Sequence, residues 1–348
     1  MTVRITGRSL NRADLVRIAR DGERVELDPA AADRMAATRS VVRAALDRGQ
    51  AVYGASTAVG VLKRVPVAAA GTDRYPTWML AQHLVGQGPA APRPVVRATM
   101  ARVANHLAEA SPGVRPEVAR RLIDLLNADT IPDVHSIGSI GQADLAPLSE
   151  VGVAVIDGFD LEPGEGTALI DNNAFATGWA ALAIDDAEAL LDTLDVAGAL
   201  SLEGFGANPS MLHPAIAEVR PYPGLARTLA TVRDLLAGSA LWDAAPRNLQ
   251  DPLSFRNLPQ LLGAGRDALA HVDAVLAVEL NANQGNPIVV PAEDRVVSIA
   301  NFEILPLAAA LDYLRIVLAS ILSAAAERVV KLLGTPWSGL PTGLVPEP

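Results

Sequence analysis

Residues 138–148 read GSIGQADLAPL, a glycine-bearing turn that leads into an apolar segment. Glycine lets the backbone of a turn adopt conformations that other residues avoid. Asp144 is placed to cap a helix over 145–156, because the carboxylate of an N-cap accepts hydrogen bonds from the first free N–H groups. The stretch therefore predicts a displayed loop followed by a helix, and its function depends on what the loop holds.

Helical patterns account for most of the remaining chain. Asp28 and Pro29 form an N-cap followed by proline at the first helical position, and apolar residues then recur at helical spacing until Gly49. We predict further helices at residues 94–107, 116–126, 179–200, 225–238, 261–282 and 304–333. The strand signals are short, namely RVELD near residue 25 and a hairpin of PIVV and RVVSI near residue 290. The expected fold class is mainly α.

The composition narrows the class of protein and its partners. The chain has 348 residues, of which 50% are hydrophobic and 4% aromatic, so it can bury a large core and favours packed helices over a β-sandwich. A net charge of −10 argues against binding to nucleic acid or to an anionic membrane. The absence of cysteine excludes disulfides and thiolate chemistry and fits a cytoplasmic location. The N-terminus has no apolar stretch, so we expect no signal peptide.

The segment from Ile304 to Ala326 is apolar and long enough to cross a bilayer. However, Asp312 and Arg315 lie in its middle, and Pro306 lies near its start. Charged residues are costly in the centre of a membrane. We therefore predict a buried core helix and no membrane partner.

Polar clusters supply candidate site residues. In VYGASTAVG, Tyr53 is the one side chain that can serve as a catalytic acid or base in a loop otherwise made of small residues. His83 precedes two glycines in HLVGQG, although a lone histidine is also a common structural residue. In QDPLSFRNLPQ, Gln250 and Arg256 lie before a helix. The arginine there can bind a carboxylate with two hydrogen bonds, or it can belong to a capping network.

Two further clusters lie at predicted helix ends. ELNANQGNP contains Asn286, and C-capping of the preceding helix explains most of this pattern. SIANFEILPL contains Phe302 and Glu303 at the start of an apolar helix, where a carboxylate can simply face the positive end of the helix dipole. We expect no metal, because no ligand spacing supports a site built from His83, Asp171, Glu279 and Glu303.

The order of these motifs is more specific than any one of them. Along the chain follow VYGASTAVG, HLVGQG, HSIGSIGQADLAPL, GEGTALIDN, QDPLSFRNLPQLLGA, ELNANQGNPIV and NFEILPLAAALDYL. In this order the sequence resembles the histidine and aromatic amino acid ammonia-lyase family, from Ile5 to Leu344. The resemblance implies one domain, with a loop-rich part over 1–178 and a bundle of long helices over 179–348. It also implies a homo-oligomer, a dimer or tetramer, whose active sites are shared between subunits.

The resemblance further implies a cofactor that this loop is not built to form. In the family, an Ala-Ser-Gly tripeptide cyclises and dehydrates to a methylidene-imidazolone electrophile, MIO. Here only Gln142 and Ala143 stand in its place, so the loop is one residue short and lacks the serine. The upstream Ser139 precedes Ile140, whose β-branched side chain crowds the nitrogen that would close the ring. We expect no MIO and no other cofactor.

Other positions match or depart from the family one by one. Tyr53 matches the family's loop base, His83 an assisting residue, and Arg256 the arginine that binds the substrate carboxylate. Leu253 replaces a tyrosine of the family, and two positions, Asp171 and Glu303, have become acidic. Members of the family continue past the SGLP motif, so we expect a C-terminal third to be absent or encoded elsewhere.

These departures lead to a functional hypothesis. General acid–base catalysis contributes about 10²–10⁴-fold, which cannot replace an electrophile in the removal of an unactivated proton. We therefore predict no ordinary histidine, phenylalanine or tyrosine ammonia-lyase activity. Instead we expect a lyase or cyclase that eliminates, adds, cyclises or isomerises a small substrate with its own carbonyl activation, in specialised-metabolite biosynthesis.

In this hypothesis Tyr53 is the base, Glu303 or Asp171 is the acid, and His83 assists. The predicted substrate contacts are Arg256, Gln250, Gln142, Asn286, Leu253 and Phe302. The alternative is a non-catalytic or split partner subunit of an ammonia-lyase-like complex. A long bundle that is cut short exposes apolar helix faces, which a companion protein would cover.

Overall fold

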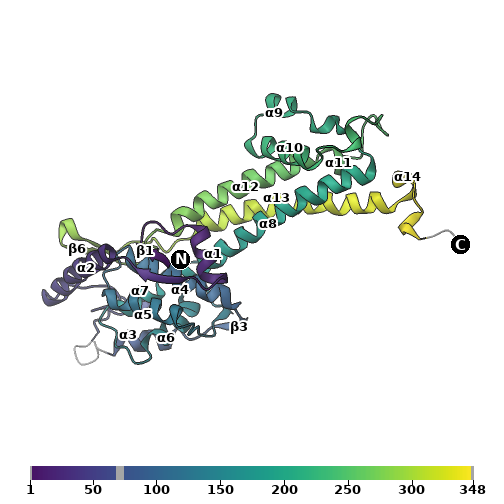
Figure 1. Cartoon of the computed structure of the whole chain (residues 1–348). Coiled ribbons are helices and arrows are strands. Elements are labelled where there is room, and N and C mark those ends of the chain that lie inside the picture. Colours follow the sequence, from purple (N-terminus) through teal and green to yellow (C-terminus); the bar gives the residue numbers. More distant parts are fainter. Residues whose placement is uncertain (1, 68–73, 346–348) are drawn as a thin grey trace. The chain divides into compact units, whose positions relative to one another are not determined.

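The fold of the chain is mainly helical, as predicted (Figure 1). It is known from a computed structural model, which describes residues 2–67 and 74–345. The principal helices are α1 (Arg12–Arg20), α2 (Pro29–Asp47), α3 (Tyr75–Gln82), α4 (Arg93–Ala108), α5 (Pro116–Asn127), α6 (Leu145–Ile156), α7 (Glu165–Ile170), α8 (Ala174–Phe205), α10 (Pro223–Leu235), α12 (Leu258–Glu279) and α13 (Leu305–Leu333). Shorter helices are α9 (Ala215–Val219), α11 (Leu253–Arg256) and α14 (Thr335–Ser338). The strands are β1 (Thr2–Ile5), β2 (Arg24–Leu27), β3 (Gln87–Ala90), β4 (His135–Ile137), β5 (Ile288–Val290) and β6 (Arg295–Val297).

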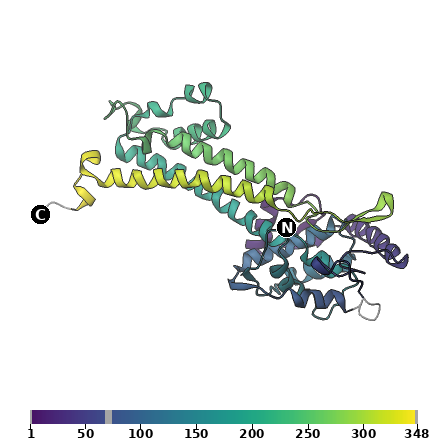
Figure 2. The same cartoon turned by 180° about the vertical axis from the view of Figure 1, so that it is seen from behind.

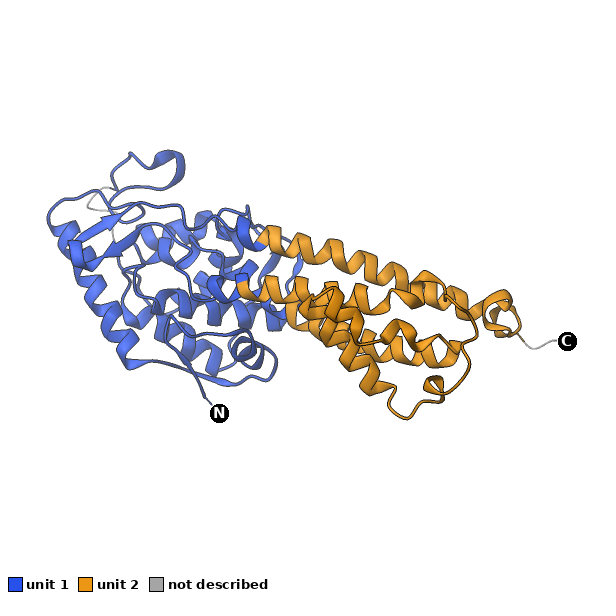
Figure 3. Ribbon diagram, turned by 90° about the horizontal axis from the view of Figure 1, so that it is seen from above, with its two compact units in different colours: residues 1–183, 275–307 blue, residues 184–274, 308–348 orange. Residues whose placement is uncertain are grey.

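The chain divides into two compact units (Figure 3). Unit 1 consists of residues 1–183 and 275–307, and unit 2 consists of residues 184–274 and 308–348. We expected the change from a loop-rich part to a helix bundle at residue 179. This position lies close to residue 183, after which the chain first passes from unit 1 into unit 2. The sequence pattern did not predict that residues 275–307 return to unit 1.

Unit 1 is built around α4. Every residue of α4 from Val95 to Ala108 is buried, and the helix packs against α1 and α5. Strands β1 and β2 pair in parallel, and β5 and β6 form the predicted hairpin. This hairpin lies beside α2, as Figures 1 and 2 show from opposite sides. Helix α2 begins as predicted, because the Asp28 side chain accepts a hydrogen bond from the Ala31 N–H and Pro29 follows it.

Unit 2 contains the longer parts of α8, α12 and α13, which run side by side (Figures 1 and 3). The three helices meet at Gly265 of α12. A Cβ atom at this position would lie 2.7 Å from Ile321 of α13 and 2.9 Å from Leu191 of α8. The glycine therefore allows a close approach of the helices that a larger residue would prevent.

Helix α13 has the predicted bounds but not the predicted burial. It is long and apolar enough to cross a membrane by length and composition, and 22% of its most apolar window is buried within the described chain. Leu314 and Ile321 are buried, whereas Ile316 and Val330 on the opposite side are 69% and 55% exposed. The prediction of a buried core helix was therefore wrong for this chain, because a pattern that is apolar all round does not reveal what covers each side.

Several short elements were not predicted. Helix α1 is capped by Asn11, whose side chain accepts a hydrogen bond from the Asp14 N–H, and α3 and α7 have eight and six residues. Short helices carry weak periodicity, so sequence patterns detect them poorly. The short helix α14 follows α13, and residues 346–348 lie outside the described part of the chain.

Candidate active site

Unit 1 contains a cavity of about 300 Å³ that gathers side chains from distant parts of the chain. Four polar residues named in the sequence analysis lie on its wall, namely Tyr53, His83, Gln142 and Asp171, together with Phe302. The other lining residues are Val59, Gly60, Met79, Ile140, Leu145, Thr167 and Ile170. The cavity is thus mostly apolar, with a few polar groups that can orient and activate a small molecule.

Tyr53 is held in a loop that packs closely on α7. The neighbouring Gly54 has a φ of +69°, and a Cβ there would lie 2.0 Å from the Thr167 Oγ1. That hydroxyl donates a hydrogen bond to the Gly54 carbonyl. The Tyr53 hydroxyl accepts a hydrogen bond of 3.0 Å from the Gly60 N–H, so its own proton is free for a ligand. Burial, and to a lesser extent the charge of Asp171, raise the pKa of Tyr53.

His83 is the C-cap of α3. Its Nδ1 lies 2.8 Å from the Met79 carbonyl oxygen, one turn earlier in the helix. Because a carbonyl can only accept a hydrogen bond, Nδ1 carries the proton in the neutral ring and Nε2 keeps its lone pair. The histidine is therefore oriented as a hydrogen-bond acceptor at Nε2.

Asp171 follows the last residue of α7 and is mostly buried at the cavity wall. Its carboxylate makes no hydrogen bond and no ion pair with the residues in 2–67 and 74–345. Burial disfavours the charged form and raises the pKa of Asp171 to about 7. The cavity therefore contains one acidic group whose charge changes near neutral pH.

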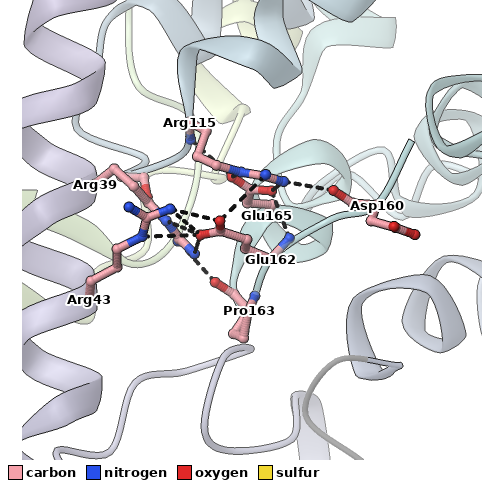
Figure 4. Close-up of polar contacts among 8 residues, drawn as sticks. Arg39, Arg43, Arg115, Asp160, Glu162, Pro163 and Glu165 are labelled. Atoms are coloured by element: carbon pink, nitrogen blue, oxygen red, sulfur yellow. Dashed lines mark hydrogen bonds and ion pairs between the residues drawn. The ribbon is translucent and has the colours of Figure 1, made fainter. Parts of the chain in front are cut away.

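A cluster of ion pairs holds the start of α7 in place (Figure 4). Glu165 is fully buried, and its carboxylate accepts hydrogen bonds of 2.7 and 2.9 Å from the Arg115 guanidinium. Next to it, Glu162 pairs with Arg39 and Arg43. Burial opposes ionisation of Glu162, but the hydrogen bonds from Arg43 and Arg39 outweigh it and lower the pKa to about 2. The cluster fixes the start of α7, the helix that contains Thr167 and is followed directly by Asp171.

The loop 138–144 is anchored by a carboxylate that we expected to cap a different helix. Asp144 precedes α6 but makes no side-chain hydrogen bond to that helix. Its Oδ2 accepts the Ala176 N–H at 2.7 Å, near the start of α8, and its Oδ1 accepts the Ser139 hydroxyl at 2.6 Å. Asp144 thus occupies the N-cap position of α6, as predicted, but the expected capping hydrogen bond is absent, because the buried carboxylate accepts an N–H group of α8 instead.

The same loop is tied to the segment before α13. The Gln142 side chain donates a 3.4 Å hydrogen bond to Glu303, and the two residues also form an isolated β-bridge. Asn173 accepts the Ala143 N–H and donates to the Phe302 carbonyl oxygen. Glu303 is exposed and is not among the residues that line the cavity; its Oε1 accepts the Leu305 N–H at 3.1 Å. This contact is the helix-start role that we had considered as the alternative to catalysis.

Ala143 adopts a backbone conformation that favours glycine. Its φ is +80° and its side chain is fully buried. A left-handed conformation costs an L-residue about 1–2 kcal/mol. We expect Ala143→Gly to leave the free energy of unfolding unchanged or to raise it by up to about 1 kcal/mol, because the relief of strain exceeds the loss of one methyl group.

The matched control for this prediction is Ala101→Gly. Ala101 is equally buried but lies in the middle of α4, where glycine costs about 1 kcal/mol relative to alanine. Urea denaturation of the two variants should give opposite or clearly separated shifts of the midpoint. Equal destabilisation by both substitutions would contradict a strained Ala143.

The residues of this loop do not fit a MIO group. The tripeptide Ala-Ser-Gly occurs nowhere in the 348 residues. The serine of the loop, Ser139, is engaged by Asp144 and is followed by Ile140 rather than glycine. Among residues 2–67 and 74–345 there is also no group of three His, Cys, Asp or Glu side chains placed to hold a metal ion.

The remaining predicted contacts lie away from the cavity wall. Asn286 accepts the Ile299 N–H at 2.8 Å and lines a cavity of about 20 Å³ that shares Tyr53. Gln250, Leu253 and Arg256 belong to unit 2, where Gln250 and Leu253 are exposed. The Arg256 guanidinium makes no hydrogen bond or ion pair with the described residues.

Sequence reasoning missed some residues that shape the site. Thr167 and Met79 line the cavity, and Tyr75 interacts electrostatically with Tyr53. Burial raises the pKa of Tyr75 as well. No local motif marks these residues, because they become neighbours only when α3 and α7 pack together.

Comparisons with known proteins agree with this architecture. The family model for aromatic amino acid lyases matches residues 10–159 and 154–348. The histidine ammonia-lyase of Deinococcus radiodurans is 34% identical over 98% of this chain and 70% of its own length. The structure of ergothionase from Treponema denticola superposes with a TM-score of 0.95 at 26% identity, over 100% of this chain and 75% of that one. A tyrosine aminomutase from Streptomyces globisporus gives a TM-score of 0.93 at 26% identity, over 100% and 74%.

Fold and cavity together define a mainly helical protein with the ammonia-lyase fold. The chain belongs to the aromatic amino acid lyase family, and it is a lyase- or aminomutase-type member of the ammonia-lyase superfamily.

Proposed function

We propose that this protein is a lyase or cyclase that works without MIO, by acid–base chemistry on a small carbonyl- or carboxylate-bearing substrate. One observation carries the proposal: Tyr53, His83 and Asp171 share one cavity, while the adjacent loop lacks the Ala-Ser-Gly tripeptide. A proton next to a carbonyl is acidic enough for side-chain bases, so no protein-derived electrophile is needed. Elimination, addition, cyclisation and isomerisation all begin with this proton transfer.

The contacts favour a different distribution of roles from the one predicted. The raised pKa of Tyr53 keeps its phenol protonated at neutral pH, so it suits a proton donor rather than the base. His83 offers an unprotonated Nε2 and suits the acceptor. In our proposal, His83 removes the activated proton and Tyr53 protonates the oxygen or leaving group. Positioned acid–base groups of this kind typically contribute about 10²–10⁴-fold.

The remaining features of the proposal rest on the family resemblance. We propose that the protein is a cytoplasmic homo-oligomer and that Arg256 of a second copy binds the substrate carboxylate. The free guanidinium of Arg256 supports this role. A place in specialised-metabolite biosynthesis is part of the same proposal, since an altered site suggests an altered substrate.

Conventional activity provides the direct test. We expect the purified protein to release no urocanate from histidine and no cinnamate or coumarate from phenylalanine or tyrosine, followed by ultraviolet absorbance. Its intact mass should equal that of the unmodified chain, because MIO formation removes two water molecules. A histidine ammonia-lyase assayed in parallel is the control. Release of urocanate, or a mass lower by two waters, would overturn a MIO-independent mechanism.

A second candidate function is that of a non-catalytic partner subunit. It is supported by the exposed apolar side of α13, where Ile316 and Val330 face solvent in the single chain. Size-exclusion chromatography with light scattering, and affinity capture from the native host, distinguish the two candidates. A homo-oligomer that is active alone supports the enzyme, whereas a stoichiometric complex with a different chain and no activity without it supports the partner subunit.

A further inference from the structure

The cavity in unit 1 carries an uncompensated negative group. Among residues 2–67 and 74–345, Asp171 is the one carboxylate on the cavity wall, and no lysine or arginine lies there. The Tyr53 hydroxyl accepts the Gly60 N–H and makes no hydrogen bond to Asp171. A buried carboxylate without a partner is costly, so a ligand that supplies the missing positive charge gains the energy that the protein does not provide.

We propose that Asp171 makes this cavity selective for ligands with a cationic nitrogen, which pairs directly with its carboxylate. The inference deepens the proposed function by naming a charge class for the substrate, and it rests on that function for the identity of the site. It differs from the role assigned from sequence, in which Asp171 donates a proton. A neutral or anionic ligand of the same shape leaves the carboxylate unpaired or forces it to take up a proton.

Cation binding at Asp171 is coupled to proton release. With a pKa of about 7 in the empty cavity, the carboxylate is mostly ionised at pH 8 and mostly protonated at pH 6. The apparent affinity for a cation scales with the ionised fraction, so it should fall about tenfold over these two pH units. The affinity for a cation must fall, not rise, as the pH falls, because only the ionised form of the Asp171 carboxylate attracts the cation.

Other titratable groups near Asp171 have to be considered. His83 lies on the same cavity wall as Asp171. Glu303 bonds to the lining residue Gln142, and Tyr75 interacts with Tyr53. Gly285 separates the backbone of Asp171 from His106, whose pKa burial lowers to about 3, so that imidazole stays neutral over this range.

Three probes of one size test the proposal: the cation 2-phenylethylamine, the neutral 2-phenylethanol and the anion 3-phenylpropionate. Binding to the full-length protein is measured by calorimetry at pH 6, 7 and 8. The amine stays protonated throughout, because its pKa is close to that of a lysine at about 10. We expect the amine to bind at least tenfold more tightly than the alcohol at pH 8 and to lose about tenfold by pH 6.

The variant Asp171→Asn keeps the shape of the side chain and removes its charge. It should bind amine and alcohol alike at pH 8, and any pH dependence that remains comes from groups other than Asp171. It should also melt at a higher temperature than the wild type at pH 8, because a buried unpaired carboxylate is gone. Asp133→Asn, which removes an exposed carboxylate that does not line the cavity, is the matched control and should retain the preference for the amine.

Equal affinities of the wild type for amine and alcohol at pH 8 would overturn the proposal, even if Asp171→Asn does not fold. Retention of the amine preference in Asp171→Asn would do the same. These outcomes are independent of turnover, so a failure here leaves the acid–base proposal standing. Conversely, amine selectivity in a protein without activity supports this inference and counts against the proposed reaction.

Discussion

Glu165→Gln is expected to lower the free energy of unfolding by about 3–5 kcal/mol. The Glu165 carboxylate is fully buried and accepts the Arg115 and Glu162 backbone N–H groups as well as the Arg115 guanidinium. A glutamine offers one acceptor oxygen and places an NH₂ group against donors, so several buried groups lose their partner. The loss should appear as a lower midpoint of urea denaturation at fixed protein concentration.

The control for this prediction is Glu117→Gln, which also removes the carboxylate of a glutamate–arginine pair. Glu117 bonds to Arg120 at 3.0 Å, but both side chains are 51% exposed. Exposed pairs contribute about 0–1 kcal/mol, so this variant should hardly move the midpoint. Similar shifts for the two variants would show that the buried cluster does not support α7. Because Asp171 directly follows α7, Glu165→Gln should also weaken binding of 2-phenylethylamine.

Tyr53→Phe is expected to lower activity by about 10²–10⁴-fold without loss of the fold. The substitution removes the hydroxyl that donates a proton in the proposed mechanism and leaves the ring in place. Proton transfer can be followed without the natural substrate, as deuterium uptake from D₂O into a ketone probe such as phenylacetone. The melting temperature should change little, because the hydroxyl accepts one exposed N–H, that of Gly60.

Tyr222→Phe is a suitable control for the tyrosine prediction, because its side chain is 55% exposed and lies in unit 2. Its rate of deuterium uptake should match that of the wild type. An unchanged rate in Tyr53→Phe would remove Tyr53 from the mechanism. If the wild type exchanges no proton with any carbonyl probe, the partner-subunit candidate gains support.

The sequence predicts the elements with strong local signals. Asp28 and Pro29 place the start of α2 correctly, and the long apolar run places α13 within one residue at its start. In both cases the signal lies in neighbouring residues. The same holds for the β5–β6 hairpin, whose two strands are close in sequence.

Properties that depend on packing could not be predicted in this way. The Asp144 carboxylate bonds to α8 rather than to the helix it precedes, and nothing near residue 144 indicates this choice. Burial raises the pKa of Asp171, and the cavity wall that it shares with Tyr53, Met79 and Phe302 is assembled from elements far apart in sequence. The order of motifs brought Tyr53, His83 and Asp171 together as candidates, but only the contacts show which nitrogen of His83 is free and that Glu303 serves a helix start.

The discontinuous path of unit 1 has a consequence for the order of events during synthesis. Residues 1–183 contain Tyr53, His83, Gln142 and Asp171, whereas Phe302, a further lining residue of the cavity, belongs to the segment 275–307. The ribosome therefore makes residues 184–274 of unit 2 before it can supply that segment. Domains of a growing chain tend to fold as soon as they are complete. This cavity is consequently closed late, and a nascent chain arrested before residue 302 carries the acid–base side chains in an unfinished site.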